Sequence, residues 1–282
     1  MKYINSKYGL FDSASSFTYF DDSDNGGGFA SAGGEAKITL PAETSKLYVS
    51  FELYTSGTSS VSCWPFQIYF SDGDYSSPKN STVQFHLVGG SSDSLYLKTN
   101  NTERLETNIS RKEWHKIYCV ADSVAGTIEF YLDGDKVGVY DSYVKTGVKA
   151  ISAKLKPYKA NSSLYTKIKN IIISDQYFPL NEEVITVPAT IAADGWSVSS
   201  GTYSTDTEGA TLTVAPDISV LNGYKVTACN IGIGTATLGD TIQNLELKAG
   251  DYTTTKAIPA TNGGMWIDGF ADVKTTTITA KK

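Results

Sequence analysis

Apolar and polar residues alternate with a period of two along much of the chain. The pattern is clearest in Lys46–Tyr54, where almost every second residue is apolar, and it recurs in Phe66–Phe70, Val83–Val88 and Leu95–Lys98. Such alternation is typical of β-strands with one face on a core. No stretch longer than about ten residues has the 3.6-residue period of an amphipathic helix. The pattern therefore predicts an all-β fold built from short antiparallel strands.

The strongest hairpin signal lies in residues 114–140. Two alternating segments, Trp114–Ala121 and Thr127–Leu132, are joined by a short connection. Asp133-Gly134 then predicts a tight turn into Lys136–Tyr140, because aspartate and glycine tolerate the left-handed backbone that two-residue hairpin turns require.

This hairpin, with Trp114-His115 at its start and Leu132-Asp133-Gly134 at its turn, resembles that of laminin-G-like, concanavalin A-type jelly rolls. Lys167–Ser174 is similar to the closing strand of those domains, which returns beside the first strand. The resemblance covers roughly Gly34 to Asp175 and implies a β-sandwich. It leaves function open, because this scaffold hosts lectins, adhesion modules, glycan-cleaving enzymes and structural domains.

The length of 282 residues suits two β domains. We predict a laminin-G/concanavalin A-like sandwich over 1–180, a linker near Pro179–Glu183, and a smaller immunoglobulin-like or jelly-roll sandwich over 184–282. In the second domain, small β-forming residues alternate with turns at roughly ten-residue spacing. The strands expected there are Val184–Val187, Gly195–Val198, Ala210–Val214, Tyr224–Ala228, Gln243–Leu247, Met265–Phe270 and Thr275–Thr279.

The composition, with 18 Tyr, 11 Phe and 25 Gly, favours β structure. A formal net charge of −6 argues against a nucleic-acid partner, which calls for a basic face. A local basic stretch is expected to be a solvated face or an edge strand guarded by lysines. Its members are Lys154, Lys156, Lys159, Lys167 and Lys169.

The three cysteines, Cys63, Cys119 and Cys229, are widely spaced, odd in number and without metal-ligand spacing. We expect reduced, buried thiols, although a bridge between Cys63 and Cys119 stays open. The N-terminal residues lack the apolar region of a secretory signal, and no apolar run is long enough to insert into a membrane. A leaderless β-sandwich of this kind is a familiar profile for a phage virion protein made in the host cytoplasm.

Carboxylates are not arranged for catalysis in any recognisable pattern. The Glu-x-Asp-x-x-Glu strand of concanavalin A-type hydrolases is absent. Glu52 and Glu129 are single acids expected to face solvent, while Glu103, Glu106 and Glu113 are expected to cluster around a polar loop and to face water. No Ser-His-Asp or Cys-His set emerges from the spacing, so we expect no enzymatic activity.

The two histidines have different expected places. His86 should share a face with Gln84, and the resemblance implies a structural role for His115.

Aromatic residues near polar loops are the best ligand-binding candidates, since sugar rings stack on exposed aromatic faces. They are Trp64, Tyr69, Tyr75, Tyr158 and Trp266. Core packing is the alternative for the tryptophans, and it is the expectation for Trp114.

Calcium is the one metal worth considering, at the carboxylates Asp21, Asp22 and Asp24. A solvated turn is the alternative for these residues, and no other cofactor is expected.

These observations favour a non-catalytic virion surface protein, such as a capsid decoration, head-fibre or tail-associated protein. It would display a lectin-like domain for attachment to glycans or a host surface. Its expected partners are other virion proteins and copies of itself, with no nucleic acid and no membrane insertion. The alternatives are a glycan-active hydrolase or lyase on a jelly roll, and a bacterial surface adhesin.

Overall fold

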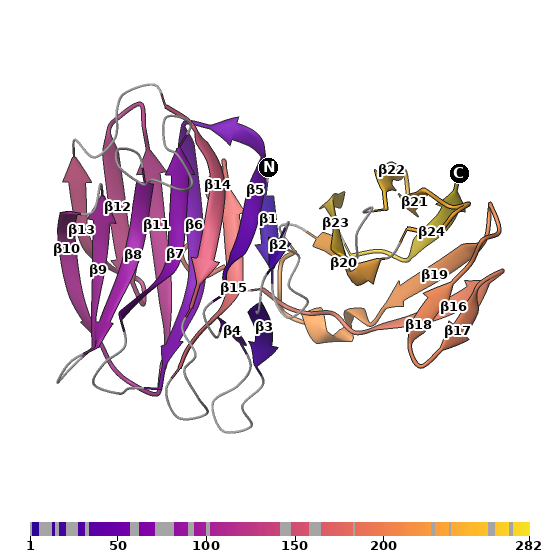
Figure 1. Ribbon diagram of the computed structural model, residues 1–282, viewed down its shortest axis with the longest axis horizontal. Coiled ribbons are helices and arrows are strands. Elements are labelled where there is room, and N and C mark those ends of the chain that lie inside the picture. The colour runs from indigo at the N-terminus through magenta and orange to yellow at the C-terminus, as the bar shows by residue number, and fades with distance from the viewer. Residues whose placement is uncertain are drawn as a thin grey trace. The chain divides into compact units, whose positions relative to one another are not determined.

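The protein is described here from a computed structural model (Figure 1). The described residues are 2–5, 13–14, 17–20, 28–31, 34–56, 62–70, 82–89, 93–99, 102–141, 148–157, 165–182, 184–226, 229–236, 238–258, 263–270 and 273–282. The chain divides into two compact units, Met1–Val184 and Ile185–Lys282, and each is considered by itself.

The first unit contains an eight-stranded antiparallel sheet in the order β13-β12-β11-β6-β15-β4-β3, with β1 also paired to β15. Because β15 lies between β1 and β6, the closing strand does return beside the first, as the resemblance implied. The strands are β1 (Lys2–Asn5), β3 (Phe17–Phe20), β4 (Gly28–Ser31), β6 (Lys46–Thr55), β11 (Trp114–Asp122), β12 (Thr127–Leu132), β13 (Asp135–Asp141) and β15 (Thr166–Ser174).

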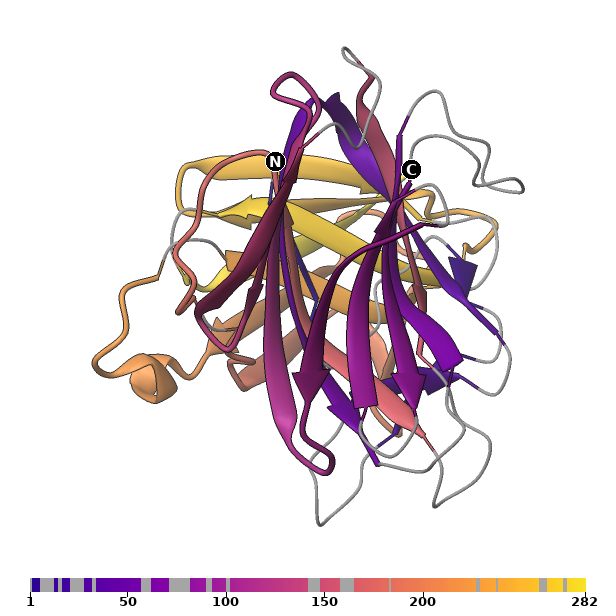
Figure 2. The ribbon, with the colours of Figure 1, turned by 90° about the vertical axis from the view of Figure 1, so that its left-hand side faces the viewer.

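A second, seven-stranded sheet of the same unit runs in the order β10-β9-β8-β7-β14-β5-β2 (Figure 2). Its pairings are all antiparallel. The strands are β2 (Ser13–Ala14), β5 (Ala36–Thr44), β7 (Ser62–Phe70), β8 (Thr82–Gly89), β9 (Asp93–Thr99), β10 (Thr102–Ile109) and β14 (Ala150–Lys156).

Aromatic contacts join the two sheets into a sandwich. The rings of Phe51 on β6 and Phe66 on β7 stack with centroids 5.0 Å apart. Phe85 on β8 meets Phe51 and Phe130 on β12 edge to face, each at 5.4 Å. All four rings are completely buried. Burial of this apolar surface is the main force holding the layers together.

The predicted all-β jelly-roll architecture is confirmed, as is its hairpin. β12 and β13 are joined by Asp133 and Gly134 alone, and their φ angles of 52° and 94° are those of a left-handed two-residue turn. Glycine carries this conformation without strain, and aspartate tolerates it better than most residues.

Two expectations about the first unit were wrong in part. Glu103 and Glu106 do not lie in a loop, because Thr102–Ile109 forms the edge strand β10, although Glu106 is exposed as expected. For the basic stretch, the edge-strand alternative does not apply to β14, which carries Lys154 and pairs on both sides with β5 and β7, whereas Lys156 on the same strand is 44% exposed. Lys167 on β15 is fully buried, with its Nζ 4.7 Å from the centre of the Tyr54 ring.

The segment after β15 packs back onto the eight-stranded sheet. Phe178 is buried against Tyr118, with ring centroids 5.3 Å apart, and the Tyr118 hydroxyl donates to the Phe178 carbonyl at 3.1 Å. Further along, the Lys116 ammonium donates to the carbonyl of Glu182. These contacts attach the end of the first unit to its own sheet.

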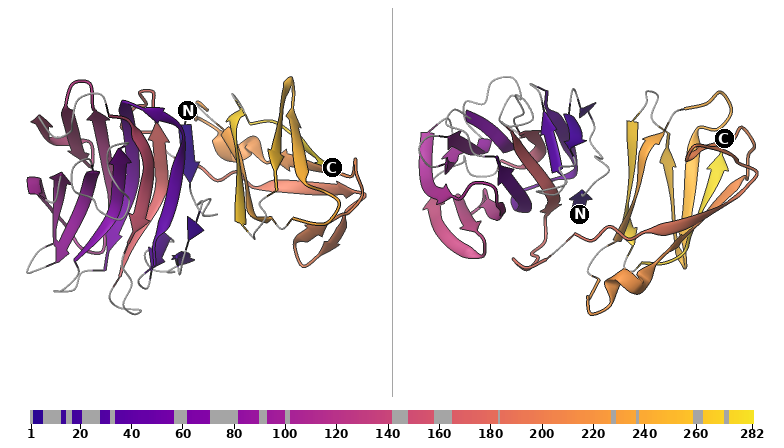
Figure 3. Two further views of the ribbon diagram at one scale, coloured as in Figure 1. Left: turned by 45° about the horizontal axis from the view of Figure 1, so that its top comes forward. Right: turned by 90° about the horizontal axis from the view of Figure 1, so that it is seen from below.

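The second unit is also built from strands (Figure 3). A five-stranded sheet has the order β16-β19-β24-β21-β22, and two further pairs are β17-β18 and β20-β23. A single 3-10 turn, η1 (Ile218–Leu221), lies between β19 and β20. The strands are β16 (Ala189–Asp194), β17 (Ser197–Ser199), β18 (Thr202–Ser204), β19 (Thr211–Pro216), β20 (Cys229–Ala236), β21 (Asn244–Ala249), β22 (Tyr252–Ala257), β23 (Gly263–Phe270) and β24 (Thr276–Lys281).

The core of the second unit gathers Leu212, Leu245, Leu247 and Ile278, with Trp196 packed against them. Two predicted strands are misplaced here. Val184–Val187 is irregular and the strand begins at Ala189, and residues 224–226 are irregular before β20 begins at Cys229. Both errors are shifts of one element along the chain, which alternation alone does not exclude.

Candidate functional site

The outer face of the seven-stranded sheet, meaning the face turned away from the other sheet, carries a group of polar and aromatic side chains. Alternation fixes which residues lie there. Phe66, Ile68, Phe85 and Leu87 are buried towards the core, so their neighbours Gln67, Tyr69, Gln84 and His86 lie on the outer face. Because the strands are in register, these side chains form rows that cross the strands.

The first row, called the stacking row, consists of Trp64, His86 and Tyr96 on β7, β8 and β9. The rings of Trp64 and His86 stack with centroids 5.0 Å apart and planes inclined by 14°. His86 and Tyr96 are partners in the β8–β9 register, and their ring centroids lie 6.3 Å apart. Trp64 remains 38% exposed, so part of its ring is open to a ligand.

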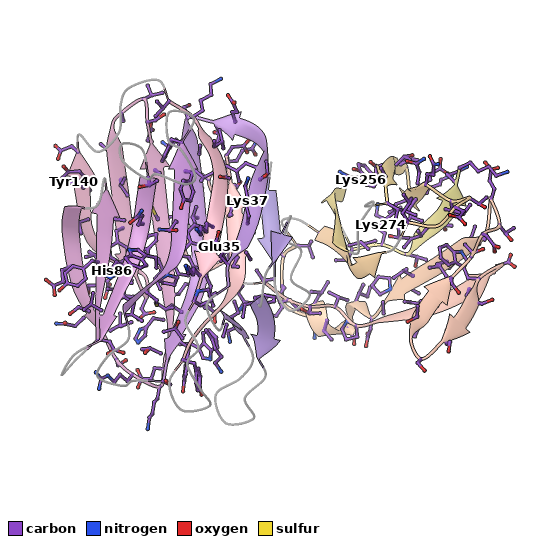
Figure 4. All side chains as sticks on the ribbon, viewed as in Figure 1. Glu35, Lys37, His86, Tyr140, Lys256 and Lys274 are labelled. Carbon is purple, nitrogen blue, oxygen red and sulfur yellow. The ribbon has the colours of Figure 1, made fainter. Side chains whose placement is uncertain are left out.

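The second row, called the lysine–glutamine row, is made by Lys37, Lys154, Gln67 and Gln84. The register places Lys154 opposite Lys37 on one side and opposite Gln67 on the other, and Gln67 opposite Gln84. Both glutamines are buried although they lie on the outer face. Lys154 pairs with Glu35 at 2.5 Å, and Figure 4 shows Glu35 and Lys37 on the same part of this sheet.

The third row, called the hydroxyl row, contains Thr39, Ser152, Tyr69 and Thr82. It is linked to the glutamines, because the Tyr69 hydroxyl donates to Gln67 Oε1 at 3.1 Å and Gln84 Nε2 donates to Thr82 Oγ1 at 3.3 Å. Burial, with a smaller contribution from Glu35, raises the pKa of Tyr69 to about 12. Tyr69 is therefore a neutral hydrogen-bonding group at physiological pH.

Together the three rows combine an exposed aromatic surface, amide and hydroxyl groups, and ammonium groups on one face. Carbohydrates present apolar C–H faces and many hydroxyls, so they need stacking surfaces beside hydrogen-bonding groups. The arrangement is suited to that class of ligand.

The residues predicted to bind a ligand differ in their position and exposure in the structure. Trp64 and Tyr69 lie on this face, Trp64 exposed and Tyr69 buried. Tyr75 and Tyr158 lie outside the described residues. Trp266 belongs to β23 of the second unit, where its side chain is not described.

Several residues of this face were missed as binding candidates, above all His86, Gln84, Gln67 and Lys154. The available signal was the period of two in Thr82–Val88, which puts Gln84 and His86 on one face as predicted. This period does not show which strands flank β8. It therefore did not predict that Trp64 and Lys154 lie on the same face as Gln84 and His86.

Trp114 does not plug the core between the sheets, contrary to expectation. It is half-buried on the outer face of the eight-stranded sheet, where Lys169 Nζ lies 3.8 Å from the centre of its ring and Tyr54 packs beside it at 5.4 Å. A cation held over an aromatic face stabilises this arrangement.

Glu52 and Glu129, the two acids considered for catalysis, are half-buried on the outer face of the eight-stranded sheet. Glu52 accepts from Asn170 Nδ2 at 2.7 Å and pairs with Lys169 at 3.4 Å. Glu129 accepts from the Tyr131 hydroxyl at 2.6 Å, and this bond is the largest influence lowering the pKa of Glu129. Both acids therefore take part in local polar networks.

Ser110, His115 and Asp133 come together without having been predicted to do so. His115 Nδ1 lies 2.7 Å from Asp133 Oδ2, and Nε2 lies 2.9 Å from Ser110 Oγ. The geometry differs from a nucleophilic triad in one respect. Nε2 also lies 3.1 Å from the Ser110 carbonyl oxygen, and Ser110 Oγ donates to Glu113 at 2.6 Å. Because the single hydroxyl proton of Ser110 goes to Glu113, this set ties the segment of Ser110 to the hairpin turn at Asp133.

Metal ligands are not grouped in the part of the chain that the structure describes, where no cluster of three or more His, Cys, Asp or Glu residues is found. The proposed calcium ligands Asp21, Asp22 and Asp24 lie outside that part. Cys63, Cys119 and Cys229 are free thiols, and burial raises the pKa of Cys119 far above its ordinary value. Within the described residues, no helix is long and apolar enough to cross a membrane.

Neither a protein-family model nor a curated protein sequence matches this chain. Solved structures do. An endo-β-1,4-glucuronan lyase from the fungus Trichoderma reesei matches with a TM-score of 0.43 and 9% identity, over 61% of this chain and 94% of the lyase. Lectin I-B4 from Griffonia simplicifolia matches with a TM-score of 0.39 and 9% identity, over 61% and 92%. A carbohydrate-binding module from Bacillus subtilis matches with a TM-score of 0.35 and 14% identity, over 57% and 94%. At TM-scores below 0.5 these similarities carry no argument about function, which rests on the residues of this chain.

Proposed function

We propose that the first unit is a carbohydrate-binding module that holds its ligand on the outer face of the seven-stranded sheet, without chemical change to the ligand. The observation that carries the proposal is the Trp64–His86 stack at 5.0 Å, in which Trp64 stays 38% exposed on a face lined by polar side chains. Stacking on an exposed indole ring holds the apolar face of a sugar.

The polar groups of this face are held in place before a ligand arrives. Tyr69 fixes the Gln67 amide and Thr82 fixes the Gln84 amide, both through short-range contacts within one strand. Groups that are already ordered lose less conformational entropy when they bind. This preorganisation gives the exposed Trp64 ring a rigid polar surrounding.

A glycan array screened with the full chain, followed by titration calorimetry with the best ligand, tests the proposal. Trp64→Ala should weaken binding at least about tenfold, equivalent to about 1.4 kcal/mol. Tyr177→Ala is the matched control, because Tyr177 is 71% exposed and lies beside Tyr48 of the other sheet. No binding to any glycan, or equal affinity of the two variants, would contradict the proposal.

A glycan lyase is the second candidate, and the position of His86 favours it. His86 and Tyr69 are groups that exchange protons, and they flank the amides of Gln84 and Gln67 on one face. Abstraction of a proton beside a sugar carboxyl needs a base, an acid and a group that stabilises the carboxylate. Ultraviolet absorbance of an unsaturated product decides between the candidates: a signal lost in His86→Ala supports the lyase, and no signal with a ligand that binds supports the module.

For the whole chain, we also propose that it is part of a virion. There it would associate with other virion proteins and with copies of itself. A net charge of −6 and the pairing of a sandwich with a second β unit support it. Mass spectrometry of purified particles tests it: the chain should be present in a fixed proportion to the major capsid or tail proteins.

A further inference from the structure

We propose that the second unit binds a second copy of this chain through β16, an edge strand of its five-stranded sheet. The two β16 strands pair antiparallel about a two-fold axis and unite the sheets of two copies into one. This inference rests on the self-association proposed for the whole chain and names the surface that serves it. Glycan binding by the first unit does not depend on it.

β16 is exposed along its whole length. All six residues of Ala189–Asp194 are exposed, whereas β22, the strand at the other edge of the sheet, alternates between half-buried and exposed residues (Figure 1). β19 pairs with one side of β16, and among the described strands none pairs with its other side. In an antiparallel pair, every second residue directs its N–H and C=O away from the neighbouring strand. The outward backbone groups of β16 can therefore bind another strand.

The apolar core of the second unit becomes open towards β16. Leu247, Ile278 and Leu212 are register partners in adjacent strands, and all three are buried. Ala193 continues this row on β16, opposite Leu212, but it is exposed. Ile191 lies two residues away on the same side and is 43% exposed. A further strand beside β16 would extend the row and cover Ile191.

β16 lacks the residues that prevent pairing at an edge. Its one charged residue, Asp194, is at its end, and its pairing with β19 contains no bulge. The opposite edge strand, β22, carries Lys256. Natural edge strands are protected by lysines, prolines and bulges, because an apolar edge without them accepts another strand. Of the two edges of this sheet, β16 is therefore the one suited to pairing.

A second copy fits this edge because β16 is complementary to itself. In an antiparallel pair about a two-fold axis, the core sides of both strands coincide when Ile191 lies opposite Ile191 of the other copy. Ala189 then lies opposite Ala193. The two Asp194 carboxylates lie three residues from the axis at opposite ends, about 20 Å apart along the strands. This separation exceeds the Debye length of about 8 Å, so like charges do not oppose the pair.

The size of this interface predicts a weak dimer. Six strand residues on each side are fewer than the about 20–30 residues of a standard protein interface. We therefore expect a dissociation constant in the micromolar range or above. Copies held close together on a particle have a high effective concentration, which favours even a weak pair.

Sedimentation velocity of the full chain tests the inference. Between about 1 μM and about 1 mM, the sedimentation coefficient should rise from that of a monomer to that of a dimer. Ile191→Lys should raise the dissociation constant at least about tenfold, because it places two ammonium groups opposite each other at the axis. Thr255→Lys is the matched control, since it adds the same charge at an exposed position of β22 and should leave the dimer intact. Thermal unfolding shows whether each variant folds.

A disulfide locates the contact. Opposite Cα atoms in an antiparallel pair lie about 4.5–5.5 Å apart, which a disulfide can span. Mild oxidation of Ile191→Cys should therefore give a covalent dimer that a reductant reverses. The wild-type chain, whose three native cysteines are free thiols, and Thr255→Cys are the controls and should stay monomeric on a non-reducing gel.

The outcomes separate this inference from the proposed function. Dimerisation that is lost only in Ile191→Lys, together with the covalent dimer of Ile191→Cys, supports the contact through β16. A chain that stays monomeric up to about 1 mM overturns it and leaves glycan binding and the presence in particles to their own tests. Loss of the dimer in Thr255→Lys alone overturns it, because the contact would then lie at β22. Equal loss in both folded variants also overturns it, as a general effect of charge.

Discussion

Trp64 on β7 and His86 on β8 stack nearly parallel, 5.0 Å apart, on the outer face of the seven-stranded sheet. Trp64 is the exposed member of the pair and His86 the buried one. The imidazole ring therefore acts as a platform that fixes the plane of the indole ring. A fixed plane matters for stacking on a sugar, because an immobilised side chain loses less entropy on binding.

The first prediction concerns that platform. His86→Ala should weaken glycan binding about three- to tenfold, because Trp64 then loses the ring that orients it. His86→Phe should retain most of the affinity, since phenylalanine preserves a flat ring at the same place. Titration calorimetry checks both variants, and a larger loss in His86→Phe than in His86→Ala would contradict the platform role.

The second prediction is a dependence of stability on pH. Burial raises the pKa of Tyr69 to about 12, whereas an unfolded tyrosine titrates near about 10. The folded chain thus holds this proton more tightly. Its contribution to the free energy of unfolding is complete below about pH 10 and is lost as the pH rises towards about 12.

Urea unfolding between about pH 8 and 11 measures this effect. The free energy of unfolding should fall more steeply with pH in the wild type than in Tyr69→Phe, which has no proton to lose. Parallel slopes in the two proteins would show that Tyr69 titrates at its ordinary pH in the folded chain.

The third prediction concerns the segment after β15. Phe178→Ala should lower the free energy of unfolding by about 3 kcal/mol, because its buried ring packs on Tyr118 and Tyr48. Tyr177→Ala, next to it in sequence but 71% exposed, should cost less than about 1 kcal/mol. Chemical denaturation distinguishes the two, and equal costs would mean that the segment does not dock as described.

The fourth prediction compares two ion pairs. Asp93 is 1% exposed, takes two bonds from Arg111 at 2.9 and 3.0 Å, and accepts from Thr55 Oγ1. Asp93→Ala should cost about 3 kcal/mol, because the Arg111 charge and the Thr55 hydroxyl lose their partner. Lys46 pairs with Asp122 at 3.2 Å in a more exposed place, so Lys46→Ala should cost less than about 1 kcal/mol. Denaturant midpoints of both variants check the difference.

Local patterns were enough to predict much of the first sheet. In β6 the apolar residues Leu47, Val49, Phe51 and Leu53 recur at every second position, and the Asp133-Gly134 turn has residue types that accept its left-handed backbone. β10 was missed because Glu103 and Glu106 look like loop residues. Charged residues are equally at home on an edge strand, where they discourage pairing with another chain, and β10 is such an edge.

Only part of the candidate site could be predicted from the sequence, because the site depends on contacts between distant strands. Trp64 and Tyr69 were identified by their residue type, but the rows that surround them depend on which strands become neighbours. Lys154 lies almost ninety positions from Gln67 in sequence, and the β7–β14 register places them opposite each other. Such long-range pairing depends on the fold of the whole sandwich, and no local sequence pattern predicts it. An edge strand was therefore kept as one of two alternatives for the lysines of β14, although their strand is internal.

The binding face itself can be tested by following tryptophan signals. The chain has four tryptophans, so its nitrogen–proton NMR spectrum should contain four indole signals, and Trp64→Phe identifies the one from Trp64. Addition of the glycan selected by the array should shift the Trp64 signal and leave those of Trp114 and Trp196 in place. A ligand that shifts Trp114 or Trp196 while the Trp64 signal stays unchanged would contradict binding on this face.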